Sequence, residues 1–161
     1  MRPTSVVASK AMKKSLATLF GTLTVVGLTS AQAQADEPVD FVTTILPVLE
    51  AKCMDCHRAP FENPRTGRIT RPKGGLRMDT VEEIMKGGDE GLSIVKGKPD
   101  ESLAYTRTKL PEDDLDHMPP EGNEPLTDEE KEALRKWIEQ GADFGDWTES
   151  KFDPEGNKIE D

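Results

Sequence analysis

The apolar residues before the first cysteine recur as they do in an amphipathic helix. Phe41, Ile45 and Leu49 follow one another at intervals of four residues, and Asp40 just before them is a typical N-cap. This spacing predicts a helix that begins near residue 41 and runs up to the first cysteine. Pro47 lies inside it, and because proline lacks the backbone N–H that a helix interior needs, we expect a kink or a helix restart there.

Two further helices are marked by capping boxes, in which a Ser or Thr N-cap is followed three residues later by Glu or Gln. Thr80 with Glu83 predicts a short helix, and Thr127 with Glu130 predicts a longer one that continues to residue 140. Glycines follow both helices, at 87–88 and at 141, where the left-handed backbone that ends a helix is cheapest for glycine. The apolar face of the longer helix consists of Leu134, Trp137 and Ile138.

The rest of the chain has little periodicity. A short helix is predicted from about residue 99 towards residue 110, whereas residues 58–75 and 111–126 are rich in proline or glycine and are expected to be loops. The acidic tail from Asp143 onward is expected to be frayed. No stretch alternates apolar and polar residues convincingly as a strand does. The pattern therefore predicts an all-α fold, with three to five helices held together by long loops.

The first 35 residues have the three parts of an export signal. A positively charged start (residues 2–14) precedes an apolar stretch (residues 16–30), and small residues follow up to Ala35. An uncleaved anchor is the alternative, but the apolar stretch is shorter than the ~20 residues of a membrane-spanning helix. We predict a signal peptide at 1–35, cleaved after Ala35 or otherwise after Ala33, and a mature periplasmic protein that is not in the membrane. Its domain would span 36–147, followed by a flexible acidic tail at 148–161.

Charge narrows the range of partners. The chain has a formal net charge of −10, and because residues 1–35 hold four basic residues and no acidic one, the remainder carries −14. Such a chain would be repelled by phosphate backbones, so nucleic acid is excluded as a partner. The charge suits a soluble protein, and one that meets a basic surface on a partner.

The two cysteines carry the strongest chemical signal. Cys53-Met54-Asp55-Cys56-His57 is the C-x-x-C-H pattern of covalent haem attachment. Residues three apart on a helical turn point the same way, so both thiols can form thioether bonds with one porphyrin, and the next side chain can bind the iron. A thioredoxin-like pair would need neighbouring strands, a zinc site would need two more ligands, and a plain disulfide leaves the histidine unexplained. We therefore predict one covalently bound haem c.

A second iron ligand would come from His117 or a methionine. Met118 lies in a proline-stiffened loop before the last predicted helix, and its thioether suits haem iron. His117 is the rival, and we expect it instead to be exposed and solvated. Met78 and Met85 are expected to pack beside the second helix.

Together these motifs resemble a class I cytochrome c, in particular the planctomycete-type cytochrome c domain. The resemblance rests on residues 53–57, 74–79, 87–91, 97–102, 118–120, 126–130 and 137–142. It implies a cytochrome c fold in which the first and last helices cross beside the haem, and it places Met118 at the methionine-ligand position. The implied site is then Cys53, Cys56, His57 and Met118, with His57 and Met118 on the iron.

The implied function is electron transfer rather than catalysis. A His/Met-ligated iron has no open position for a substrate, so the protein would carry single electrons between redox partner proteins. One alternative is a haem enzyme or a redox or gas sensor with a labile sixth ligand. Another is a haem subunit that docks a dehydrogenase or oxidase.

The segment from Arg58 to Lys73 departs from the family pattern because it looks longer than expected. It holds five basic residues against a single acid, Glu62. Three roles stay open for it: pairing with haem propionates, docking an acidic partner, or serving as a solvated loop.

Overall fold

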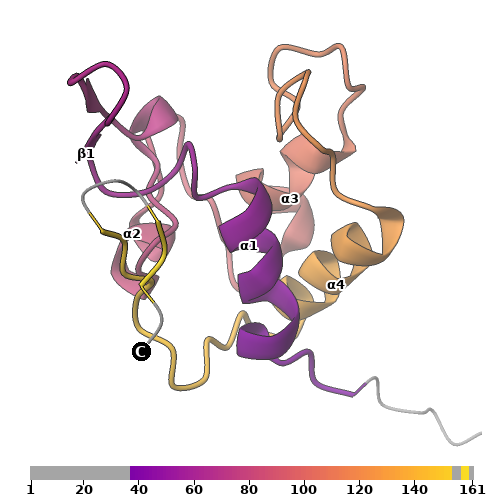
Figure 1. Cartoon of the computed structure of the whole chain (residues 1–161). Helices are drawn as coiled ribbons and strands as arrows, with labels where there is room; N and C mark the ends of the chain where they lie inside the picture. Colours follow the sequence, from indigo (N-terminus) through magenta and orange to yellow (C-terminus); the bar gives the residue numbers. More distant parts are fainter. Residues whose placement is uncertain (1–36, 154–156, 160–161) are drawn as a thin grey trace, which may run out of the picture. The chain divides into compact units, whose positions relative to one another are not determined.

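The computed structural model describes residues 37–153 and 157–159, so the expected signal peptide at 1–35 lies outside the described residues. The described part contains four α-helices, several single helical turns and one small hairpin (Figure 1). None of its helices is long and apolar enough to cross a membrane. In chain order the elements are η1 (Phe41–Ile45), α1 (Leu46–Lys52), β1 (Phe61–Glu62), β2 (Ile69–Thr70), η2 (Lys73–Gly75), α2 (Val81–Lys86), η3 (Pro99–Glu101), α3 (Leu103–Thr106), η4 (Arg107–Lys109) and α4 (Asp128–Glu139).

The first predicted helix forms as two successive segments. Asp40 caps it as expected, since its carboxylate accepts a hydrogen bond of 2.8 Å from the backbone N–H of Thr43. The π-helical turn η1 then gives way to α1 just before Pro47. Proline is tolerated in the first turn of a helix, where its missing N–H would have no partner, so the helix restarts there.

Both capping boxes mark the starts of helices. Thr80 accepts a bond of 3.1 Å from the N–H of Glu83 at the start of α2. At α4 the box is reciprocal, because Thr127 accepts from the N–H of Glu130 at 3.2 Å and the Glu130 carboxylate accepts from the N–H of Thr127 at 2.7 Å. The helix predicted near residue 99 is a series of short turns, η3, α3 and η4.

The loop at 58–75 contains a hairpin that the sequence did not predict. Strands β1 and β2 pair antiparallel, with Phe61 opposite Thr70 and Glu62 opposite Ile69. Only two residues of each strand pair, so no alternation of polar and apolar residues could reveal them. The hairpin is a small addition to an otherwise helical structure.

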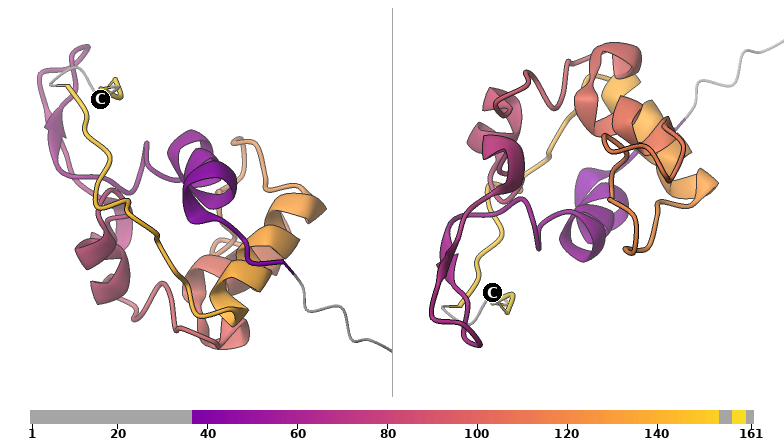
Figure 2. Two further views of the ribbon diagram at one scale, coloured as in Figure 1. Left: turned by 90° about the horizontal axis from the view of Figure 1, so that it is seen from below. Right: turned by 90° about the horizontal axis from the view of Figure 1, so that it is seen from above.

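The core forms where η1 and α1 meet α4. The ring of Phe41 lies 5.2 Å from that of Trp137, centroid to centroid, and both rings are almost fully buried. This contact confirms the expectation that residues of the first helix meet the apolar face of the last. In Figures 1 and 2, α2 and the hairpin lie on one side of α1, and α3 and α4 lie on the other.

The expectation of a frayed tail is wrong for its described residues. Phe144 is buried, and its ring centroid lies 4.9 Å from that of Phe41 and 5.1 Å from that of Trp137. Further on, the N–H of Val81 donates to the carbonyl of Thr148 at 3.0 Å, beside the start of α2. Burying the apolar surface of these aromatic side chains is favourable, and it requires the tail to pack. This gain outweighs the tendency of an acidic segment to stay solvated.

Residues 148–153 and 157–159, placed in the expected flexible tail, continue across the structure as a C-terminal strap. The N–H of Ser150 donates to the carbonyl of Asp79 at 2.8 Å, and its hydroxyl donates to Glu50 of α1 at 2.7 Å. Lys158 forms an ion pair of 2.9 Å with the same Glu50. The strap therefore links α1 to the segment before α2, and Figure 1 shows it passing α2 towards β1.

Candidate functional site

A cavity of about 500 Å³ lies between α1, the loops on either side of α2, and the segment before α4. Its size falls within the usual range of cofactor sites, ~300–1,000 Å³, and its lining is mostly apolar. Exposed residues such as Cys56 and Leu115 lie on its rim, so it opens to solvent. Four predicted site residues line it together: Cys53, Cys56, His57 and Met118.

The two cysteines lie at the end of α1, in one turn of chain. The N–H of Cys53 donates to the carbonyl of Leu49 at 2.9 Å, and the N–H groups of Cys56 and His57 donate to the carbonyl of Cys53 at 3.1 and 3.0 Å. This turn keeps the motif compact behind α1. Both thiols are free, and burial raises the pKa of Cys53 to about 12. Its thiol is therefore protonated at neutral pH.

The ring of His57 is held by a backbone carbonyl. Its Nδ1 lies 3.2 Å from the carbonyl oxygen of Leu76, which can only accept a hydrogen bond. Nδ1 therefore carries the proton and Nε2 is left with a lone pair, the arrangement in which second-shell contacts orient a metal-binding histidine. Burial lowers the pKa of His57, which favours the neutral imidazole that iron requires.

Residues 76–79 clamp the chain that carries His57. Besides the Leu76 contact, the N–H of Met78 donates to the carbonyl of His57 at 2.6 Å. The buried carboxylate of Asp79 accepts from the N–H of Ala59 at 2.9 Å. Three hydrogen bonds therefore fix residues 57–59 against one extended segment.

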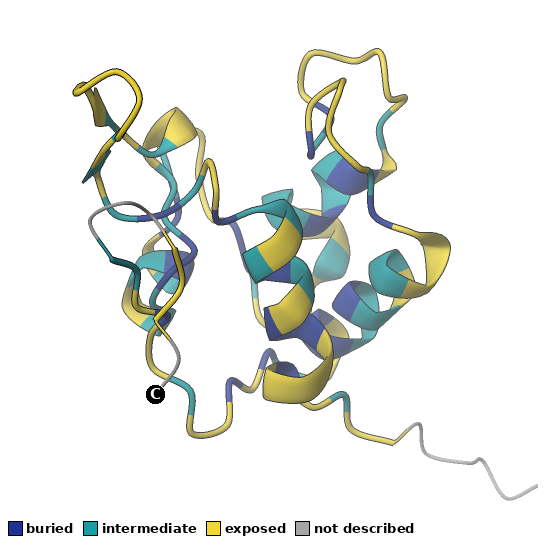
Figure 3. Ribbon diagram, viewed as in Figure 1, coloured by how far each residue is buried: buried dark blue, intermediate teal, exposed yellow. Residues whose placement is uncertain are grey.

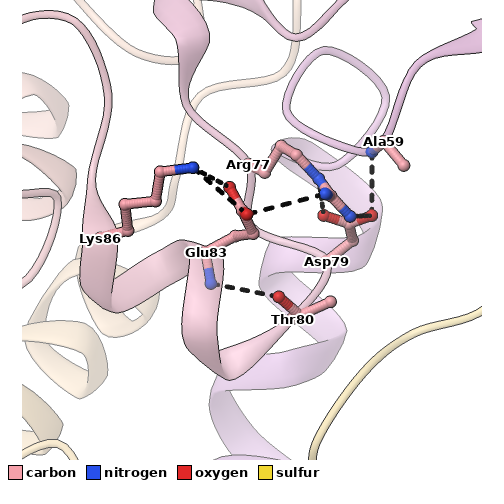
Figure 4. A network of polar contacts seen from close by, with 6 residues as sticks. All are labelled: Ala59, Arg77, Asp79, Thr80, Glu83 and Lys86. Atoms are coloured by element: carbon pink, nitrogen blue, oxygen red, sulfur yellow. Dashed lines mark hydrogen bonds and ion pairs between the residues drawn. The ribbon is translucent and has the colours of Figure 1, made fainter.

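Asp79 is itself held by a polar network, drawn in Figure 4. Arg77 donates to its two carboxylate oxygens from Nε and Nη2, each at 3.0 Å. Such a bidentate pair fixes the orientation of a carboxylate as well as its charge. Arg77 also lies 3.8 Å from Glu83 of α2, which in turn pairs with Lys86. Sequence reasoning missed Asp79, because its partner Ala59 lies twenty positions away and no local pattern links them.

The structure separates the two candidates for the second iron ligand. Met118 is half-buried and lines the cavity. His117 does not line it, and the expectation that it is exposed is wrong: the side chain is 2% exposed, with Nδ1 2.7 Å from the carbonyl oxygen of Pro119. The turn after residue 114 directs the imidazole of His117 inward, where its Nδ1 has a hydrogen-bond partner in the carbonyl of Pro119. Met78 is buried and Met85 packs against the core, as expected.

Close backbone packing shapes one wall of the cavity. Gly88, which lines it, lies so near residues 74–76 that a Cβ at this position would be 2.5 Å from the carbonyl oxygen of Gly74. The N–H of Asp89 donates to that same carbonyl at 2.8 Å. A side chain at Gly88 would push away the segment whose Leu76 carbonyl holds His57.

Ionic contacts close the cavity beside α4. Lys52, at the end of α1, donates to Glu130 at 2.7 Å and to the carbonyl of Pro125 at 3.0 Å, and it pairs with Glu124 at 3.1 Å. The hydrogen bond with Glu130 raises the pKa of Lys52. Burial raises the pKa of Glu130, but its bonds with Lys52 and Thr127 outweigh this, and its pKa is lowered overall. The ends of α1 and α4 that border the cavity are thus joined.

The residues present fit a covalently attached haem. The cavity combines a mostly apolar lining with two free thiols in C-x-x-C-H spacing, an imidazole whose Nε2 is available, and a thioether from another segment. Glycine at position 88 allows the cavity wall to pack against residues 74–76, which a side chain there would push away. Soft thioether and imidazole ligands are those that electron-transferring haem proteins use.

Comparison with known proteins agrees with this site. Residues 53–122 match the family model described as Planctomycete cytochrome C. The match begins at Cys53, includes His57 and Met118, and leaves α1 and α4 outside. No curated protein and no solved structure matches the chain significantly. The match and the geometry of the cavity together support a planctomycete-type cytochrome c domain that includes residues 53–122.

Proposed function

We propose that this protein is a periplasmic monohaem c-type cytochrome that carries single electrons between redox partners. The observation that carries the proposal is one cavity lined by Cys53, Cys56, His57 and Met118. The family match supports the coarser function of a haem-binding electron-transfer protein. The export pattern of residues 1–35 supports the periplasmic location.

Each residue of the site has a distinct role. Cys53 and Cys56 bind the haem through two thioether bonds, and His57 binds the iron through Nε2, while Leu76 holds its other ring nitrogen. Met118 binds from the segment before α4. Bound haem supplies an iron that alternates between Fe(II) and Fe(III), and its potential is raised by methionine ligation relative to bis-histidine ligation.

The placement of His117 favours a carrier over the enzyme and sensor alternatives. A haem enzyme needs an open iron position and an acid or base near it, and His117, next to Met118 in the chain, is a residue that could supply such a group. Its ring is buried against the Pro119 carbonyl and does not line the cavity. With Met118 on the iron, the chain's own residues need only bind the haem and exclude water.

The test is a visible spectrum of protein matured with the haem-attachment machinery. We expect a c-type spectrum when the protein is reduced, a far-red methionine-to-iron band when it is oxidised, and no carbon monoxide binding. Replacing Cys56 or His57 by Ala should abolish most of the haem-loaded protein. Carbon monoxide binding to the reduced wild type would instead support the enzyme or sensor, and absence of covalent haem would overturn the proposal.

A further inference from the structure

The hairpin between the attachment motif and α2 concentrates positive charge on its surface. We call residues 61–73 the basic hairpin; its exposed cations are Arg65, Arg68, Arg71 and Lys73. None of these four forms an ion pair among the described residues, whereas the cations elsewhere in that part of the chain are mostly paired with acids. Figure 3 shows most of the hairpin as exposed. Its positive charge is therefore available to a partner, in a chain whose net charge is −10.

Hydrogen bonds order the tip of the hairpin. The side-chain Oδ1 of Asn63 accepts hydrogen bonds from the N–H groups of Arg65 and Thr66 at 3.0 and 3.2 Å. The backbone carbonyl of Asn63 accepts another from the N–H of Gly67 at 2.8 Å. The N–H of Asn63 donates across the turn to the carbonyl of Arg68 at 2.9 Å. Arg65 and Arg68 are thus carried on a defined turn.

Aromatic packing fixes the base of the hairpin. Arg58 is buried, and its guanidinium lies 4.0 Å from the ring centroid of Phe61 and 4.7 Å from that of Phe152 in the C-terminal strap. These contacts hold the hairpin against the strap, and Figure 2 shows the two segments side by side. Arg58, although basic in sequence, therefore belongs to the packing of the hairpin and not to its exposed charge.

The hairpin ends at the cofactor cavity. Lys73 and Gly74 both line the cavity, and the N–H of Lys73 donates to the carbonyl of Cys56 at 3.0 Å. A protein bound to the hairpin would therefore lie next to the attachment site. Arg65, Arg68 and Arg71 do not line the cavity and are exposed, so their charges lie outside the cofactor site.

We propose that the basic hairpin is the docking surface for a redox partner protein with an acidic surface patch. The partner's redox role rests on the proposed function, whereas the charge complementarity rests on the hairpin alone. Because the Debye length is ~8–10 Å at physiological salt, a partner at the hairpin responds to these cations more than to the distant acids. An anionic membrane is less suited, since it would face the whole negative protein, and Ile69 is the exposed apolar side chain the hairpin offers.

The test compares two triple variants with equal change in charge. Arg65→Glu, Arg68→Glu and Arg71→Glu reverse the hairpin, while Lys86→Glu, Lys96→Glu and Lys98→Glu reverse exposed lysines elsewhere. Binding of poly-L-glutamate to the haem-loaded protein is measured by calorimetry at several salt concentrations. We expect the hairpin variant to bind at least about tenfold more weakly, with a smaller salt dependence, and the control to bind within about twofold of wild type.

The outcomes separate this proposal from the proposed function. Equal losses in both variants, or no binding by the wild type, would overturn the docking surface while leaving the haem spectrum of the wild type intact. Stronger hairpin-dependent binding to phosphatidylglycerol vesicles than to poly-L-glutamate would identify a membrane instead and also overturn it. A wild type without covalent haem would refute the electron-transfer role, although the charge-dependent binding could still be measured.

Discussion

The carboxylate of Asp79 accepts a hydrogen bond of 2.9 Å from the backbone N–H of Ala59, two residues beyond His57 of the C-x-x-C-H motif. Asp79 is buried and is held by Arg77, so this contact ties the attachment loop to a fixed point. The chain that follows His57 is therefore held in part by Arg77 and Asp79, two residues that do not line the cavity.

Replacing Asp79 by Ala should destabilise the protein and lower the yield of haem-loaded protein. The change leaves the N–H of Ala59 without its acceptor and Arg77 without its bidentate partner, which costs about 1–3 kcal/mol of unfolding free energy. Denaturant unfolding and haem content measure the two effects. Glu83→Gln is the control, because it weakens the outer 3.8 Å contact with Arg77 and the pair with Lys86 but leaves the Arg77–Asp79 bonds in place. Equal losses in both variants would contradict the role of Asp79.

Replacing Met118 by Ala should leave haem attached but open the iron to added ligands. The attachment residues are untouched, so the thioether bonds form, while the far-red band disappears, carbon monoxide binds and the potential falls. Visible spectra and a redox titration measure these changes. Met85→Ala, a methionine that does not line the cavity, should keep all wild-type signals. An unaltered spectrum in Met118→Ala would place the ligand elsewhere.

Glu130→Gln should destabilise the protein by about 1 kcal/mol at neutral pH, through the weakened capping box and the lost pairing with Lys52. Because the folded-state pKa of Glu130 is lowered, this stabilisation is present above the ordinary glutamate value of 4.5 and is lost as pH falls through the folded pKa. Unfolding free energies from pH 7 to pH 3 should therefore converge for the two proteins. The exposed Glu129 gives the control Glu129→Gln, and a difference that persisted in acid would contradict this account.

Gly88→Ala should destabilise the protein by about 1–3 kcal/mol, because the added Cβ would overlap the carbonyl of Gly74 and force residues 74–76 away from Gly88. A shift of the His57 ring signals by NMR should accompany the loss. Gly122→Ala is the control, because a Cβ at this position meets no neighbouring atom. It therefore tests only the cost of a positive φ for alanine, about 1–2 kcal/mol. That control should leave the His57 signals unchanged, and a Gly88 variant that did the same would contradict the packing argument.

The sequence predicted the features that are encoded locally. The helix starts at Asp40, Thr80 and Thr127 depend on a side chain and an N–H three residues later, so short motifs reveal them. The spacing of Phe41 and Trp137 likewise indicated the apolar face of each helix, and the family resemblance implied that these two faces would meet.

The features that were missed depend on contacts between distant segments. The burial of Phe144 and the strap beyond it require partners in η1 and α2, which no pattern within the tail can identify. His117 is surrounded in sequence by acids and prolines, and only the local turn places its ring against the Pro119 carbonyl. The Asp79–Ala59 bond was missed for the same reason.

The C-terminal strap has a consequence for the order in which the chain matures. Helix α1 is held by residues that come much later in the chain. Glu130 contacts Lys52, and Ser150 and Lys158 contact Glu50, across about eighty to more than a hundred positions. A newly made chain emerges N-terminus first, so Cys53 and Cys56 are present long before these partners. The packing around α1 is therefore complete only when these C-terminal residues are present.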